Sequence, residues 1–325
     1  MRPVSLRWPG LVVALVLLLV LSVSVGALHV PIIDAWRGLF GQGDPTVIAV
    51  VRSLRLPRAV VAMLVGAALG MSGGALQGTM RNPLAEPYLL GVSGGAAVGA
   101  VLAVTSGIAQ PFVPLAGFAG AVVTIAIAFA VAHAARGRGD PRVLLMAGVV
   151  VGAFANAAIM LVLANAPAST VRGALWWMMG SVADASWTQA AALAAYATVG
   201  AVMLLAWARD IDALALGEDT AAGLGLDVEK SARRIYLVAA LLAAATVAAA
   251  GLVGFVGLVV PHLARRVAPG RHRPLLVACA LVGAVLVVAA DLIARVARSP
   301  AELPLGAVTA LIGVPFFLAR LRKLS

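Results

Sequence analysis

Asp291 and Arg295 form the one pair whose types and spacing could do chemistry inside an apolar segment. Of the 13 Asp and Glu residues, Asp291 alone lies within a long apolar block, close to one end of it. Buried acidic side chains of this kind serve as proton relays in ion-coupled carriers. Arg295 follows four residues later, which places both side chains on one helix face. The spacing therefore favours an ion pair over a relay.

No other residues suggest catalysis. The two lysines, Lys230 and Lys323, do not follow a glycine, so a phosphate-binding loop G-x-x-x-x-G-K-[ST] is absent. Four scattered histidines and the single Cys279 form no metal-ligand pattern. No nucleophile stands at a helical spacing from a base. We expect a chain that is not an enzyme and that binds no metal or cofactor of its own.

The elements that position these side chains are apolar blocks. Hydrophobic residues make up 62% of the 325 residues and charged residues 11%, against about 25% charged in soluble domains. Blocks of about 20 apolar residues cross the bilayer as helices, because backbone amides there must be paired within the segment. We expect a single all-α domain over 1–325, a polytopic bundle of about ten transmembrane helices.

The blocks predict helices at 9–28, 57–79, 89–106, 112–135, 141–165, 188–208, 232–250, 252–266, 274–296 and 303–321, with a shorter surface helix at 170–181. The range 252–266 is short for a span, which makes it the weakest of the ten. Two blocks carry glycines every four residues (Gly66, Gly70, Gly74, Gly78 and Gly91, Gly95, Gly99), a spacing that allows close helix packing.

The net charge of +11 arises from Lys and Arg in short loops, which indicates membrane orientation rather than nucleic-acid binding. The asymmetry predicts a multi-pass inner-membrane protein with both termini in the cytoplasm. Topology leaves seven outer arginines unexplained: Arg37, Arg52, Arg55, Arg58, Arg172, Arg295 and Arg298.

The longest predicted cytoplasmic segment is 209–234. It contains two short amphipathic stretches broken by Gly217, Gly223 and Gly225. A solvated loop fits this composition. So does a short helix that protrudes to dock a cytoplasmic partner, since glycines let the chain turn sharply at helix ends.

Within that segment, LGEDTAAGLG (216–225) resembles the coupling segment of ABC importer permeases. The likeness extends to further stretches: RLPR (55–58), GALQGTMRNPLAEPYLLGVSGGA (74–96), WWMMGS (176–181), GFVGLVVPHLARR (254–266), ADLIAR (290–295) and ELPLGAVTALIGVPFF (302–317). From about residue 50 onward the chain resembles the permease family that serves vitamin B12, ferric siderophores and haem.

The resemblance implies a homodimer of ten-helix subunits with its pathway along the dimer axis. Two cytosolic ATPases, carrying the ATP and Mg, would dock at the coupling segments, and one periplasmic binding protein would cap the outside. Coupling would involve Leu216, Gly217, Glu218, Asp219, Ala222, Leu224 and Gly225. Arg55, Arg58 and Arg295 would be sockets for carboxylates of the binding protein, which guanidinium forks bind bidentately.

The resemblance also implies a gate and a pathway. Asn82 and Leu84 are gate candidates in RNPLAEP, where a plain helix connection is the alternative. A second gate region falls at Pro141 and Arg142, although GDPR (139–142) departs from the small hydroxyl residues of some relatives. Asn156 and Met160 share a face of the fifth helix, which lines the pathway in the family. A hydrogen bond that packs helices is the alternative for Asn156.

The expected function is import of a metal chelate from periplasm to cytoplasm by alternating access, energised by a separate ATPase. Ferric siderophore is the first candidate, followed by haem and cobalamin. The alternative is an ATP-independent secondary carrier or channel.

Overall fold

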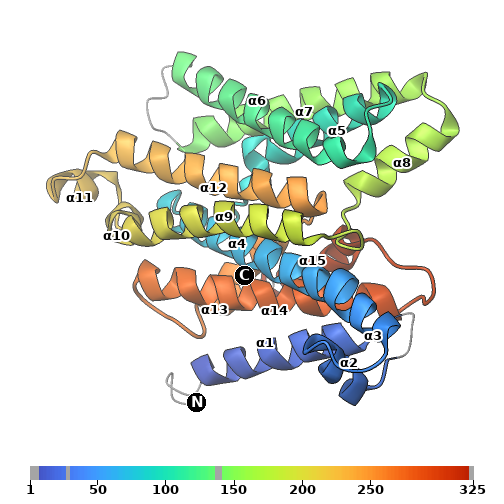
Figure 1. Ribbon diagram of the computed structural model, residues 1–325. Coiled ribbons are helices and arrows are strands. Elements are labelled where there is room, and N and C mark those ends of the chain that lie inside the picture. Colours follow the sequence, from blue (N-terminus) through green and yellow to red (C-terminus); the bar gives the residue numbers. More distant parts are fainter. Residues whose placement is uncertain (1–6, 27–29, 136–140, 322–325) are drawn as a thin grey trace.

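The computed structural model describes residues 7–26, 30–135 and 141–321, and every element in these ranges is a helix (Figure 1). The longer helices are α1 (Arg7–Ser24), α4 (Leu56–Thr79), α5 (Val92–Thr105), α6 (Val113–Ala134), α7 (Pro141–Ala164), α8 (Ala168–Met178), α9 (Trp187–Ala206), α12 (Val228–Ala250), α14 (His272–Val296) and α15 (Leu305–Leu321). The shorter helices are α2 (Ile32–Leu39), α3 (Pro45–Ala49), α10 (Ala208–Ala215), α11 (Glu218–Gly223) and α13 (Val256–Ala264). A π-helical stretch, Val50–Arg55, joins α3 to α4, and 3-10 turns cover Pro87–Leu90 and Gln110–Phe112.

Seven helices of the described chain are long and apolar enough to cross a membrane. They are α1, the continuous stretch from α3 through α4, α6, α7, α9, α12 and α14. Two further predicted ranges hold the apolar but shorter helices α5 and α15, and the predicted surface helix is α8. The all-helical class is thus confirmed, and the predicted ten spans reduce to seven of full length.

The prediction of a span at 252–266 is wrong. Its helix, α13, has nine residues, about 14 Å at about 1.5 Å per residue and less than half of a hydrocarbon core of about 30 Å. The preceding residues 251–255 are not helical, and Phe255 has a φ of 66°, uncommon for a residue with a side chain. The turn after α4 holds this break: Glu86 Oε1 accepts from Phe255 N (3.0 Å), and Tyr88 Oη accepts from Val253 N (3.2 Å).

The predicted close packing at the glycine face of α4 is confirmed. A Cβ at Gly66 would overlap the carbonyl group of Gly283, and one at Gly70 would overlap that of Cys279. Helix α4 therefore packs backbone to backbone on α14, and Gly95 and Gly99 of α5 approach the backbone of α6 in the same way. This density makes α4 the buried centre of the bundle.

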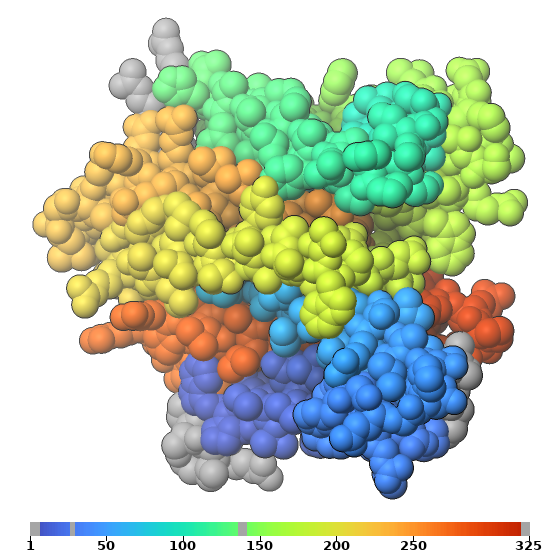
Figure 2. Space-filling view, in the orientation of Figure 1, coloured from blue at the N-terminus to red at the C-terminus, as the bar shows by residue number. Residues whose placement is uncertain are grey.

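The long helices run side by side, so the bundle has two ends (Figure 1). The α10 end carries α10, α11 and the first turn of α14. The α2 end carries α2, α3 and the last turn of α14. In the space-filling view the chain around α10 and α11 projects on the left beyond its neighbours (Figure 2).

Candidate functional sites at the two ends of the bundle

A buried ion cluster lies at the α2 end, with Asp291 at its centre. The carboxylate, 1% exposed, accepts from Arg58 Nη2 at 2.8 Å and pairs with Arg295 Nη2 at 3.0 Å. The predicted pairing of Asp291 with Arg295 is confirmed. Arg58 is a second partner, 233 residues away in the chain, and it was not expected.

Glu302 completes this cluster from the segment between α14 and α15. Its two carboxylate oxygens accept from Arg58 Nη1 at 2.8 Å and Nη2 at 2.9 Å. This fork-to-fork pairing is the strongest geometry open to an arginine. Glu302 is also the accessible member of the cluster, because its side chain is 38% exposed.

Two of the arginines close the last turn of α1. Arg55 Nη1 donates to the carbonyl oxygens of Ser24 (2.7 Å) and Val23 (3.0 Å). Arg295 donates to the carbonyl oxygens of Ser22 and Val25 and to the Ser22 hydroxyl (2.6 Å). The last carbonyls of a helix lack partners within it and carry a partial negative charge, so a guanidinium stabilises them. These contacts give Arg55 and Arg295 a structural role that the charge asymmetry did not explain.

We call Arg55, Arg58, Asp291, Arg295 and Glu302 the arginine cluster. The structure brings all three predicted docking arginines together there. They are only 6%, 8% and 6% exposed, and their guanidinium groups bind atoms of the same chain. A role in docking a binding protein stays a prediction, and it would require part of this cluster to open.

At the α10 end, the predicted segment 209–234 forms α10 and α11 before it enters α12. Gly217 (φ 116°) and Gly225 (φ 82°) take positive φ on either side of α11, as the sequence predicts, whereas Gly223 is simply its last residue. Six of the seven predicted coupling residues are exposed: Leu216, Glu218, Asp219, Ala222, Leu224 and Gly225. Gly217 is buried.

Two exposed leucines flank α11. Leu216 is 67% exposed and Leu224 is 66% exposed, and the acidic first turn of α11 lies between them. The tip therefore offers a small apolar surface with an acidic edge.

Contacts that the sequence did not reveal hold this tip to the bundle. Asp212 Oδ1 accepts from the His272 backbone at 2.8 Å and pairs with its Nδ1 at 2.7 Å, which joins α10 to the start of α14. Arg234 pairs with Asp210 and lies 4.7 Å above the ring of Trp207. These side chains connect α10 to α14 and to α12.

The gate candidates of RNPLAEP lie in a turn near the same end. Asn82 Oδ1 accepts from Leu84 N at 2.9 Å, and the Leu84 side chain is 47% exposed. Nothing in the sequence indicated the role of Glu86 and Tyr88 in this turn, which accept hydrogen bonds from the backbone of Phe255 and Val253. No local pattern could have indicated those contacts, because the partners are 165 and 169 residues apart.

On α7, Pro141 is the first helical residue, and its side chain lies outside the described residues. Arg142 and Asn156 are exposed, and Met160 is 73% exposed. Asn156 thus lies at the surface of the described chain, and the gate and pathway roles stay predictions.

The FecCD transport family matches residues 14–323. The chain is 40% identical over 340 residues to the cobalamin import system permease protein BtuC of Halobacterium salinarum, covering 99% of this chain and 90% of that protein. It is 35% identical over 312 residues to the hemin transport system permease protein HmuU of Yersinia pestis, covering 95% and 92%. A structure described as an inward-facing conformation of a metal-chelate type ABC transporter matches with a TM-score of 0.86 at 30% identity, covering 97% of this chain and 98% of that one. The chain therefore belongs to the FecCD transport family, as a multi-pass inner-membrane permease of the ABC importer type.

Proposed function

We propose that this chain is the membrane-spanning half of an importer that moves a bulky metal chelate into the cytoplasm by alternating access. The family match over almost the whole chain carries the proposal. Relatives named as permeases for cobalamin, ferric citrate and haem support a chelate as the cargo. Ferric siderophore is our first candidate, followed by haem and cobalamin. ATP, with Mg, is hydrolysed on a separate subunit.

The α10 end is the proposed docking surface for that ATPase, and it faces the cytoplasm together with both termini. The exposed tip formed by Leu216, α11 and Leu224 supports this assignment, as do the ion pairs that fix the tip to α12 and α14. ATP and cargo would each favour a different global state, which is what couples two distant sites.

A second copy of the chain is the proposed neighbour of α7 and α15. Both helices expose large apolar side chains, among them Phe154 (77%), Leu161 (74%) and Leu311 (74%). Asn156, exposed on α7, would then face the pathway between the two copies, with the gate formed near Asn82, Leu84 and Arg142.

The α2 end is the proposed docking surface for the periplasmic binding protein. Glu302 occupies the fork of Arg58 as a partner's carboxylate would, and it is the accessible member of the arginine cluster. Docking would therefore exchange one carboxylate for another and free the segment that leads into α15. This exchange reconciles a docking role for Arg58 with its burial.

The test is uptake by vesicles that contain the chain, the ATPase and the binding protein encoded with it. We expect uptake of a ferric siderophore to require all three proteins and ATP. The contrary result is uptake that persists without the ATPase and follows a proton or sodium gradient, as the secondary-carrier alternative requires. Spectra of the binding protein with siderophore, haem and cobalamin identify the cargo independently.

A further inference from the structure

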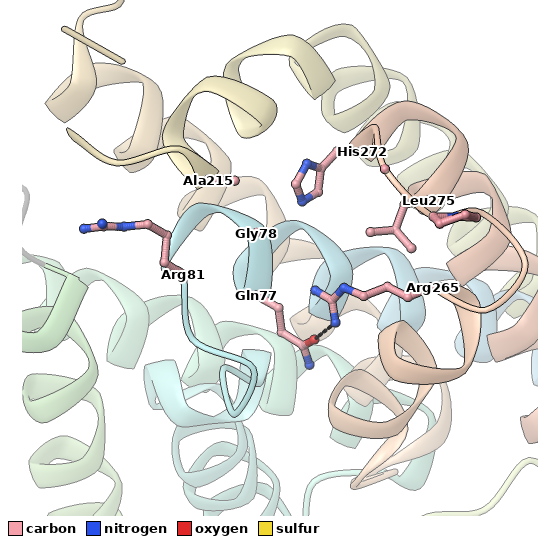
Figure 3. A pocket seen from close by; sticks show the side chains of 9 residues that line it. Gln77, Gly78, Arg81, Ala215, Arg265, His272 and Leu275 are labelled. Carbon is pink, nitrogen blue, oxygen red and sulfur yellow. Dashed lines mark hydrogen bonds between the residues drawn. The ribbon is translucent and has the colours of Figure 1, made fainter. Parts of the chain in front are cut away.

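A cavity of about 340 Å³ opens at the α10 end, between the C-terminus of α4, α10 and the segment that joins α13 to α14. Its polar lining comes from Gln77, Arg81, Arg265 and His272. Figure 3 shows the Arg265 guanidinium beside Gln77, with the His272 ring across the cavity, whereas Arg81 extends outward at the rim. The cavity borders α10 through Ala215.

Arg265 is the half-buried cation of this cavity. Among the described residues its one hydrogen bond runs from Nη1 to the neutral Gln77 Oε1, at 3.1 Å. The Gln77 amide is itself fixed, because its Nε2 donates to the Leu258 carbonyl oxygen at 3.2 Å. Burial lowers the pKa of Arg265, yet a guanidinium stays charged in proteins. A partly desolvated charge without a counter-ion is costly, so an anion placed here would be stabilised.

The described residues do not supply that anion. Neither Arg265 nor Arg81 forms an ion pair with a described Asp or Glu. The nearby acid, Asp212, is already paired with His272. The surrounding segment 265–273 carries four arginines and no acidic residue, and such a concentration of charge raises the local density of anions.

We propose that this cavity binds a phosphate group, carried by an anionic phospholipid headgroup or by a small free phosphate, with Arg265 as its main ligand. The guanidinium fork matches phosphate oxygens bidentately, and basic recesses between helices at the membrane surface are known to receive phospholipid headgroups. The volume is at the lower end of the range for small-molecule sites, about 300–1,000 Å³. It suits a phosphate with a small substituent. The cavity borders α10, which belongs to the segment proposed to dock the ATPase.

The experiment uses the full-length chain in nanodiscs of phosphatidylcholine, titrated with inorganic phosphate and followed by calorimetry. We expect saturable binding that Arg265→Gln weakens about tenfold or more, the usual loss for a hydrogen bond to a charged group. Arg266→Gln is the matched control, because Arg266 is exposed, adjacent in sequence and outside the cavity lining. It should change the affinity less than about twofold. Arg81→Ala is a second variant: Arg81 lines the cavity at its exposed rim, so this substitution should also weaken phosphate binding without disturbing the packed helices.

A parallel arm replaces part of the phosphatidylcholine with phosphatidylglycerol and measures thermal stability. Stabilisation that Arg265→Gln abolishes, without binding of free phosphate, assigns the site to a lipid headgroup. Binding of free phosphate assigns it to a soluble ligand. The proposal is overturned if neither arm shows an effect of Arg265→Gln, or if Arg266→Gln weakens binding equally. Neither arm needs ATPase or transport, so the outcome is independent of the proposed function.

Discussion

Arginine is used in opposite ways at the two ends of this bundle. At the α2 end, Arg55, Arg58 and Arg295 are almost fully buried and bind carboxylates and helix carbonyls of their own chain. At the α10 end, Arg265 is half-buried, has a neutral amide as its hydrogen-bond partner and borders an open cavity. The first arrangement stabilises contacts between segments, whereas the second leaves positive charge available to something outside the chain.

Asp291→Asn should give the largest effect, because it breaks the centre of the arginine cluster. Two buried guanidiniums would lose their shared carboxylate, and breaking a buried ion pair costs about 3–5 kcal/mol. Thermal unfolding in detergent measures the loss. Asp34→Asn is the matched control at the same end, since the Asp34–Arg37 pair is exposed and 4.0 Å apart; exposed pairs contribute at most about 1 kcal/mol. Equal losses in both variants would show that burial does not distinguish the cluster.

Asp212→Ala tests a contact at the α10 end in which a carboxylate joins two segments, as carboxylates do at the α2 end. Asp212 accepts the first backbone N–H of α14 and pairs with the His272 ring, and leaving such a partly buried donor without its partner costs about 1–3 kcal/mol. Asp219→Ala serves as the control, because Asp219 is exposed in α11 and surface changes usually stay within about 0.5 kcal/mol. Should Asp219→Ala prove as damaging, the tip would be held by α11 and not by Asp212.

Glu302→Gln separates stability from docking. Its side chain is 38% exposed, so we expect less than about 1 kcal/mol of destabilisation. If a partner's carboxylate takes its place, removing this competitor should raise affinity for the binding protein by about tenfold, or about 1.4 kcal/mol. Titration of the binding protein measures this, with Glu302→Asp as the charge-conserving control. Weaker docking in Glu302→Gln would mean that Glu302 contacts the partner directly.

Local sequence patterns predicted the features that depend on residues close together in the chain. Apolar blocks located the helices, and the spacing of four predicted the Asp291–Arg295 pair. Gly217 and Gly225 predicted the turns around α11, because each supplies the positive φ that such a turn needs.

The features that the sequence did not predict depend on residues far apart in the chain. The apolar run at 252–266 does not reveal that residues 251–255 are not helical and are held by Glu86 and Tyr88. Glu86 lies 169 residues from its partner Phe255, and Tyr88 lies 165 residues from Val253. The contact of Arg58 with Asp291 spans 233 residues, and that of Arg265 with Gln77 spans 188. Sequence resemblance singled out Arg55, Arg58 and Arg295. It could not show that their guanidinium groups bind carboxylates and carbonyl oxygens of the same chain.

Arg265→Gln should give the smallest change in stability. It tests whether Arg265, at the α10 end, differs from the structural arginines of the α2 end. Glutamine removes a half-buried charge and keeps a polar group for Gln77, so the desolvation cost that disappears offsets the hydrogen bond that is lost. We expect a change within about 0.5 kcal/mol in phosphatidylcholine nanodiscs without added inorganic phosphate. Phosphate at ten times its Kd should then stabilise the original chain by about 1.4 kcal/mol, but a variant that binds tenfold more weakly by only about 0.4 kcal/mol. If Arg265→Gln instead destabilised the phosphate-free protein as much as Asp291→Asn does, Arg265 would be an internal structural arginine like those of the α2 end, and the contrast between the two ends would be lost.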